Sequence, residues 1–324
     1  MIEHKSYILN ENVAPVIQLT FYSSSTMSTP IKLSSRADCE SFLEKFDTLL
    51  LDCDGVLWHE DTVLPGIKEA LSLLRQKGKR LIFVTNNSTK SRAAYFAKFK
   101  RLNIDANESE IFGSSYVSAY YLKNILNFPK DKKVYVIGES GITEELHLAG
   151  IRFCGSSDDD DYEFNFNKID FDPEVGAVVC GFDTHLNYKK LAKAFRYLNT
   201  NPDCIFLLTN GDTTYPANGT IYPGTGSLVA PLIKALNRDP DYVMGKPNKP
   251  MLDCIIKKFH LDAERTCMIG DRLDTDIQFG INGKFKTLLV LTGVSKEQEI
   301  LVENAPIIPD YYLTSLGDLA ELCE

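Results

Sequence analysis

The sequence predicts an α/β fold: a domain built on a parallel sheet, with a second, large α/β domain inserted into it. Short, continuous apolar runs alternate with segments of helical periodicity along most of the chain. This alternation is typical of parallel strands that are covered by helices on both faces. Polar residues follow directly after several of the apolar runs, and ligands bind at that end of a parallel sheet.

The first strand–helix units lie between residues 48 and 102. The apolar runs 48–51 and 81–84 predict two buried strands, and residues 89–102 predict a helix. Between the two strands, the spacing i, i+3, i+4, i+7 defines the apolar face of another helix, which consists of Ile67, Ala70, Leu71 and Leu74.

The middle of the chain, residues 128–240, repeats the alternation independently. Strands are expected at 134–137, 177–180 and 205–208, each followed by a helix, at 142–149, 188–198 and 226–237. A segment this long with its own elements is not a loop, so we predict a second α/β domain inserted into the first, which we call the cap. Its run Asp158–Asp161 is expected to be a solvated loop, because four adjacent aspartates cannot easily converge on one ion.

After the insertion the core resumes, with strands expected at 267–269 and 287–291 and a helix marked by Leu252, Ile255, Ile256 and Phe259. We therefore assign residues 30–127 and 241–324 to the core and residues 128–240 to the cap. Residues 1–29 are polar and serine-rich, and we expect this N-terminal extension to be disordered.

Composition excludes several classes of protein. The chain has 324 residues, enough for roughly two domains, and its net charge is −9. An acidic chain without a basic block is a poor partner for nucleic acid, and no apolar run approaches the roughly 18 residues of a membrane helix. The eight cysteines contain no CxxC pair and no secretory signal is apparent, which favours the cytoplasm, with the nucleus as an alternative.

Two aspartates follow the first strand. Asp52 and Asp54 are two residues apart, so their carboxylates point to the same side of an extended chain. Such carboxylates repel each other unless they share a cation or differ in protonation, which suits a metal ion or a nucleophile beside an acid/base group. A simple turn at Gly55 is the alternative. We expect Cys53, which points the other way, to be a packing residue, with redox control as the alternative.

A third carboxylate, Asp271, follows the strand at 267–269. Mg²⁺ prefers carboxylate and carbonyl oxygens in an octahedral arrangement. Asp52, the backbone carbonyl of Asp54, and Asp271 could provide three of these ligands. Asp276 is expected to support these ligands without binding the ion itself, and Asp274 is expected to cap a helix.

Groups that can bind phosphate without adding negative charge lie at two other places. Thr85, Asn86 and Asn87 follow the strand at 81–84 and offer a hydroxyl, amides and backbone N–H groups; an N-cap for the next helix is the alternative. Lys246 lies in a rigid Gly-Lys-Pro segment and can neutralise a phosphate or a nucleophile.

Four segments carry a resemblance to the haloacid dehalogenase (HAD) superfamily, in the order of that family's motifs: Asp52-Cys-Asp-Gly-Val-Leu-Trp58, Thr85-Asn-Asn87, Gly245-Lys-Pro247 and Gly270-Asp-Arg-Leu-Asp-Thr-Asp276. Over about residues 30–324 the chain most resembles the 4-nitrophenylphosphatase and phosphoglycolate phosphatase branch, of the fungal type. The resemblance implies a Rossmann-like HAD core with a large α/β cap inserted between the second and third motifs.

The resemblance also implies a magnesium-dependent phosphatase that acts through a phosphoaspartate intermediate. Asp52 matches the nucleophile, Asp54 the general acid/base, Thr85 and Lys246 the phosphate-binding groups, and Asp271 a metal ligand. Dehalogenases and P-type ATPases of the superfamily lack an aspartate at the position of Asp54, which favours phosphate ester hydrolysis. Related enzymes often dimerise through the cap, so a homodimer is expected.

Substrate choice is expected to lie in the cap, because the core binds only the phosphate. The segment 209–212 resembles the cap loop of phosphoglycolate phosphatases, and we expect Asn210 to contact the substrate. Pyridoxal phosphate phosphatases have His-Pro where this chain has Tyr215 and Pro216. We therefore expect small phosphorylated metabolites such as 2-phosphoglycolate, with 4-nitrophenyl phosphate as an artificial substrate. A pyridoxal phosphate or sugar phosphate phosphatase, a phosphomutase and a non-catalytic regulatory protein are the alternatives.

Overall fold

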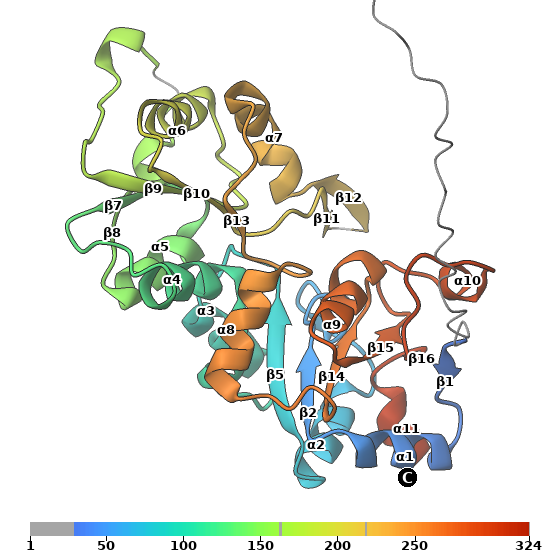
Figure 1. Ribbon diagram of the computed structural model, residues 1–324. Coiled ribbons are helices and arrows are strands. Elements are labelled where there is room, and N and C mark those ends of the chain that lie inside the picture. The colour runs from blue at the N-terminus through green and yellow to red at the C-terminus, as the bar shows by residue number, and fades with distance from the viewer. Residues whose placement is uncertain (1–28, 162–163, 218, 324) are drawn as a thin grey trace, which may run out of the picture.

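The computed structural model describes residues 29–161, 164–217 and 219–323. The disorder predicted for residues 1–29 therefore concerns residues that, apart from Thr29, lie outside the described part of the chain. Figure 1 shows a larger lower part and a smaller upper part, and each part contains its own sheet with helices packed against it.

The lower part is built on a seven-stranded sheet in which every neighbouring pair of strands is parallel. In spatial order its strands are β1 (Ile31–Lys32), β16 (Tyr311–Leu313), β15 (Lys286–Val290), β14 (Thr266–Gly270), β2 (Thr48–Leu51), β5 (Arg80–Thr85) and β6 (Ile111–Gly113). All residues of β2 are buried. The continuous apolar run from which this strand was predicted thus corresponds to a strand at the centre of the sheet.

Helices cover both faces of this sheet. Leu49 and Leu51 point into one apolar cluster and Leu50 into another, as the two-residue period of a strand requires. The first cluster includes residues of α1 (Arg36–Lys45), α2 (Ile67–Gln76), α3 (Arg92–Arg101) and α11 (Asp318–Cys323). The second includes residues of α4 (Ser114–Asn124), α8 (Lys249–Phe259) and α9 (Gln278–Asn282). A short helix, α10 (Glu297–Leu301), packs through Ile300 in a smaller cluster.

The upper part holds a five-stranded sheet, also parallel throughout. Its order is β13 (Tyr242–Val243), β10 (Ile205–Leu208), β9 (Val175–Cys180), β7 (Lys133–Ile137) and β8 (Arg152–Gly155). The face toward α6 (Tyr188–Thr200) and α7 (Thr225–Leu236) forms one apolar cluster, and α5 (Ser140–Ala149) packs on the other face. The predicted α/β fold with a second α/β unit is confirmed, although β13 lies past the boundary expected at residue 240.

Two small hairpins complete the fold. The first pairs β3 (Trp58–His59) with β4 (Thr62–Val63) in the core, directly after the segment that follows β2. The second pairs β11 (Thr214–Ala217) with β12 (Thr220–Pro223) and projects from the upper part beside the carboxyl ends of the core strands (Figure 1). Sequence periodicity did not predict either hairpin.

The run Asp158–Asp161 differs from the solvated loop that the sequence suggested. Asp159 is buried and accepts hydrogen bonds from the Tyr135 hydroxyl at 2.9 Å and from Lys193 at 2.6 Å. Lys190 lies 2.5 Å from Asp160. The cause is the spacing of lysines on α6, because residues three and four apart share one face of a helix. That face meets the acidic run and neutralises it.

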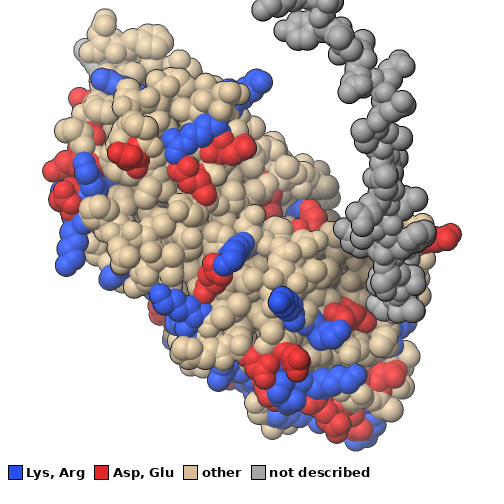
Figure 2. All heavy atoms as spheres, viewed as in Figure 1, with Lys and Arg blue, Asp and Glu red and all other residues tan. Residues whose placement is uncertain are grey.

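The surface charges on the face in view (Figure 2) are mixed, and the described cysteines form no disulfides. Lys and Arg are interspersed with Asp and Glu on the face shown in Figure 2. All eight cysteines lie in the described part of the chain, and each is a free thiol. Within the described ranges, no helix combines the length and the apolar character needed to cross a membrane.

Candidate active site

The carboxyl ends of three strands meet at the centre of the core sheet. β2 pairs with β14 on one side and with β5 on the other, both in parallel. Asp52 directly follows β2, Asp271 follows β14, and Thr85 ends β5. Residues far apart in the sequence are therefore brought to one edge of the sheet.

Lys246 reaches this edge from the segment between β13 and α8. Its Nζ lies 2.7 Å from Asp52 Oδ1 and 2.7 Å from Asp276 Oδ1, and it donates a hydrogen bond of 2.7 Å to the Val84 carbonyl. The side chain is 2% exposed. Burial alone would lower the pKa of Lys246, but Asp276 and Asp52 raise it above its ordinary value. The lysine is therefore a fixed positive charge beside Asp52.

Three carboxylates surround the same point. Asp52, Asp271 and Asp276 each bring one oxygen within 4.8 Å of the others. Burial raises the pKa of Asp271 to about 7, and Asp276 adds to this increase. Burial also raises the pKa of Asp52; Lys246 opposes the increase, and Asp276 and Asp271 reinforce it. Buried carboxylates of this kind gain from a further cation, and donors that are all oxygen suit a hard ion such as Mg²⁺.

Backbone groups and glycines hold Asp271 in place. Its Oδ2 accepts a hydrogen bond of 2.7 Å from the N–H of Val294. Gly55 has a φ of +86°, and a Cβ there would lie 2.9 Å from the same oxygen. A larger residue at position 55 would therefore be strained and would press on the carboxylate.

A π-helical turn at Leu273–Ile277 directs Asp276 back toward Asp271. Asp276 Oδ2 accepts hydrogen bonds of 3.1 Å from the backbone N–H groups of Asp271 and Arg272. Asp274 is not the helix cap that the sequence suggested. Its carboxylate accepts two hydrogen bonds from the Arg272 guanidinium, at 2.9 and 3.1 Å, while the Leu273 N–H donates to Ser295 Oγ instead.

Asp54 is the more open member of the aspartate pair, with 42% of its side chain exposed. The Trp58 indole donates a hydrogen bond of 2.8 Å to Asp54 Oδ1. Cys53, between the two aspartates, is fully buried, and burial together with Asp52 raises the pKa of its thiol well above the ordinary value. A buried thiol of this kind is a poor nucleophile, which favours packing over redox control.

The segment after β5 offers a hydroxyl and amides to the same space. Thr85 is buried, and its Oγ1 accepts a hydrogen bond of 3.1 Å from the Asn87 N–H. The N-cap of α3 is Ser91, whose hydroxyl accepts from the Ala94 N–H at 3.2 Å. The alternative interpretation of Thr85 to Asn87 as an N-cap is therefore wrong.

Asn86 and Asn210 use their side chains to join the two sheets. Asn86 Oδ1 accepts from the Lys246 N–H at 2.7 Å, and its Nδ2 donates to the Lys246 carbonyl at 3.0 Å and to the Asp212 carboxylate at 3.2 Å. Asn210 Nδ2 donates to the Asn86 carbonyl at 2.9 Å. These bonds fix the lysine and the cap strand β10 against the core. Substrate contacts by these two asparagines stay predictions.

Tyr215 brings the cap hairpin to the aspartate pair. Burial raises the pKa of its hydroxyl, and Asp54 contributes, whereas a hydrogen bond with Asn87 opposes the increase. Its ring lies 4.9 Å from the ring of Phe182, centroid to centroid. The sequence marked this position only as one where related phosphatases differ; its approach to Asp54 depends on the hairpin, which periodicity did not reveal.

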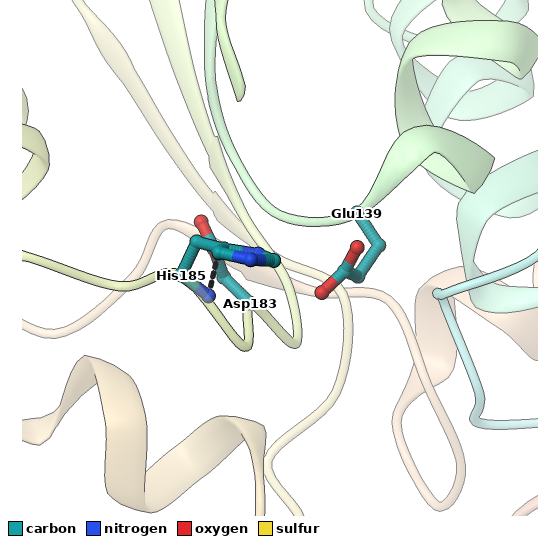
Figure 3. Close-up of side chains that lie close together, drawn as sticks. All are labelled: Glu139, Asp183 and His185. Atoms are coloured by element: carbon teal, nitrogen blue, oxygen red, sulfur yellow. Dashed lines mark hydrogen bonds between the residues drawn. The ribbon is translucent and has the colours of Figure 1, made fainter. Parts of the chain in front are cut away.

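A second group of possible metal ligands, Glu139, Asp183 and His185, lies in the cap (Figure 3). Glu139 accepts a hydrogen bond of 2.6 Å from the Thr184 hydroxyl. Asp183 accepts a hydrogen bond of 2.8 Å from the backbone N–H of His185 and forms an ion pair with Lys190 at 2.7 Å. Because neighbouring donors already satisfy these carboxylates, we assign this group no ion.

Comparisons with known proteins agree with this geometry. Residues 49–152 match a family model described as haloacid dehalogenase-like hydrolase, and residues 243–319 match one described as HAD-hydrolase-like. The chain is 48% identical to 4-nitrophenylphosphatase of Schizosaccharomyces pombe, over 90% of this chain and 98% of the relative. It is 45% identical to phosphoglycolate phosphatase 1A, chloroplastic, of Arabidopsis thaliana, over 87% and 78% of the two chains.

A third relative and a solved structure are also similar to this chain. The chain is 41% identical to glycerol-3-phosphate phosphatase of Rattus norvegicus, over 86% of this chain and 91% of the relative. The solved structure of p-nitrophenyl phosphatase from Archaeoglobus fulgidus superposes with a TM-score of 0.73 at 30% identity, covering 86% of this chain and 99% of that one. Sequence, fold and strand-end geometry agree, and the chain belongs to the haloacid dehalogenase-like hydrolases.

Proposed function

We propose that the protein is a magnesium-dependent phosphatase that hydrolyses small phosphate monoesters through a phosphoaspartate at Asp52. One observation carries the proposal: the Lys246 ammonium lies 2.7 Å from Asp52 Oδ1, beside two further buried carboxylates. A nucleophilic carboxylate, a fixed cation and an oxygen-rich metal site in one space suit phosphoryl transfer, in which positioning and charge neutralisation dominate.

The residues divide the chemistry between them. The free oxygen of Asp52 attacks phosphorus, the bond from phosphorus to the leaving oxygen breaks, and Asp54 gives its proton to the departing alcohol. Asp54 then accepts a proton from water, which attacks the phosphoaspartate, releases inorganic phosphate and restores the Asp52 carboxylate. Lys246 and Thr85 hold the phosphoryl oxygens.

Asp52, the backbone carbonyl of Asp54, and Asp271 would hold Mg²⁺, with Asp276 supporting Asp271 through the backbone. When bound, the ion supplies positive charge that neutralises the phosphoryl oxygens. The raised pKa of Asp271 supports this assignment, because burial and Asp276 outweigh the Val294 N–H, Lys246 and Arg272, which act in the opposite direction, so a further cation would stabilise the carboxylate.

The relatives' names guide the choice of substrate. They name phosphoglycolate, glycerol 3-phosphate and the artificial ester 4-nitrophenyl phosphate. We propose 2-phosphoglycolate and chemically related small esters such as glycerol 3-phosphate as the metabolites. Burial and, after it, Asp54 raise the pKa of the Tyr215 hydroxyl, so this cap residue lies near Asp54 and would contact the organic part of the substrate. A cytoplasmic homodimer stays a prediction.

Two variants test the mechanism with 4-nitrophenyl phosphate. Asp52→Asn should abolish magnesium-dependent phosphate release, because an amide is not a nucleophile. Asp54→Asn should lower kcat by about 10²-fold or more while keeping its backbone carbonyl. Near wild-type turnover by Asp52→Asn would refute the proposal. A wild-type protein that hydrolyses no phosphate ester, in a panel that includes pyridoxal phosphate and sugar phosphates, would favour a regulatory role instead.

A further inference from the structure

A lysine that the proposed mechanism does not use lies beside Asp54. Lys98 is on α3, and only 8% of its side chain is exposed. Its Nζ is 3.9 Å from Asp54 Oδ1 and 4.3 Å from the centroid of the Trp58 ring. That ring also donates its N–H to Asp54 Oδ1. Lys98, Trp58 and Asp54 therefore lie close to one another at the edge of the site.

The burial of this lysine calls for a compensating interaction. A methionine or leucine would fill the same space without the cost of removing an ammonium group from water. Its other acidic neighbour, Asp61, lies 4.0 Å away, is 68% exposed and is already paired with Arg101 at 2.6 Å. Within the described residues, Asp54 and the face of the Trp58 ring are therefore the main interactions that compensate this cation, and Asp61 contributes less.

We propose that Lys98 is a positioning residue for Asp54: with Trp58 it holds the Oδ1 side of the carboxylate and leaves Oδ2 to exchange the proton with the leaving alcohol. Trp58 fixes Oδ1 through its N–H, and Lys98 fixes the plane of the indole and attracts the same oxygen. Phe99, whose ring centroid lies 4.9 Å from that of Trp58 in an edge-on contact, supports the indole from α3. The inference rests on the proposed role of Asp54 in phosphate ester hydrolysis.

The leaving group provides a test that a merely structural lysine would fail. The value of kcat/KM covers every step up to departure of the alcohol. 4-Nitrophenolate can leave without a proton, whereas the alkoxide of an alkyl phosphate cannot. A misplaced Asp54 should therefore reduce kcat/KM for an alkyl ester far more than for 4-nitrophenyl phosphate.

The main variant is Lys98→Met, which keeps the length of the side chain and removes the charge. We expect it to lower kcat/KM about tenfold or more for 2-phosphoglycolate or glycerol 3-phosphate, whichever the wild type hydrolyses faster. This is part of the roughly 10²–10⁴-fold that a positioned acid contributes. For 4-nitrophenyl phosphate the loss should be a small fraction of that. Lys98→Arg, which keeps a cation over the ring, should restore most of the activity.

Two further variants complete the design. Lys100→Met is the matched control, because Lys100 is an exposed lysine on the same helix whose Nζ lies 4.2 Å from the Phe96 ring; it should leave both substrates unaffected. Trp58→Phe keeps a ring and removes the N–H donor, so it should give the same substrate-selective loss if Lys98→Met does not fold.

The outcomes are distinct. A selective loss in Lys98→Met, with most of the activity retained in Lys98→Arg, supports the inference; if Lys98→Met does not fold, the same selective loss in Trp58→Phe supports it. Equal losses on both esters, or no loss on either, overturn it. Failure of the proposed function would appear elsewhere, as a wild-type protein without phosphatase activity or as a fully active Asp52→Asn variant.

Discussion

Replacing Lys246 with methionine should destabilise the protein by about 3–5 kcal/mol at pH 8, the range for breaking a buried ion pair on one side. The ammonium lies 2.7 Å from both Asp52 and Asp276, whose side chains are 12% and 1% exposed. With an effective dielectric constant of about 20, each pair attracts by about 6 kcal/mol before desolvation. Desolvation offsets much of this attraction, but the variant leaves both carboxylates buried without their cation.

The loss should be smaller at pH 5. Burial already raises the pKa of Asp52 with Lys246 present, and removal of the cation raises it further. Below this pKa the folded variant binds a proton that the unfolded chain, with its ordinary aspartate pKa, releases more readily. The stability of the variant therefore recovers as the pH falls toward 5 and is lost as the pH rises through the folded pKa.

Thermal unfolding in EDTA at pH 8 and pH 5 measures both effects. A loss of this size should lower the Tm by about 5–15 °C at pH 8. Lys249→Met is the matched control: this lysine lies in the same segment, is 78% exposed and pairs with Asp253 at 2.6 Å. An exposed pair contributes about 0–1 kcal/mol. Equal melting temperatures of the two variants at pH 8, or a Lys246→Met loss independent of pH, would refute the reasoning.

Three other predictions concern the metal site and the cap. Because burial raises the pKa of Asp271 to about 7, protons compete with Mg²⁺, so the increase in Tm that Mg²⁺ causes should be larger at pH 8 than at pH 6; the reverse order would count against this site. Gly55→Ala should raise the Mg²⁺ concentration for half-maximal activity, since its Cβ would press on Asp271, whereas Gly78→Ala, at φ +71° in open space, should not. Asn210→Ala should alter the preference among phosphate esters more than turnover of 4-nitrophenyl phosphate, and equal losses on all of them would leave its bond to the Asn86 carbonyl as its whole role.

The strands at the centre of both sheets could be predicted from the sequence because their signal is local. The run 48–51 is apolar throughout since β2 is covered on both faces, and the polar residues after it mark where the strand ends. Short elements such as β6 and β13 carry no comparable signal. They are defined by pairing with distant strands, which periodicity within a short window cannot reveal.

Some residues of the candidate site could likewise be predicted from the sequence, and others could not. Asp52, Asp54 and Asp271 are recognisable because each follows an apolar strand within a dense polar motif. Lys98 could not be recognised from the sequence, because α3 carries several lysines. Only the tertiary packing of α3, which places the Lys98 Nζ over the Trp58 ring, distinguishes this lysine from the others. The lysines of α6 are similar: their pairing with Asp159 depends on a tertiary contact, and the acidic run alone suggested a solvated loop.

The most direct test of the mechanism is to trap the phosphoryl group on the chain. The Asp54→Asn variant, which lacks the base for the second step, is mixed with 4-nitrophenyl phosphate and Mg²⁺, quenched in acid and treated with borohydride, which reduces an acyl phosphate to an alcohol. Peptide mass spectrometry should then find homoserine at position 52 and unmodified aspartate at position 271, with no such product in the variant that also carries Asp52→Asn. Modification at another residue, or turnover of substrate by the wild type without any trapped species at Asp52, would contradict a phosphoaspartate mechanism.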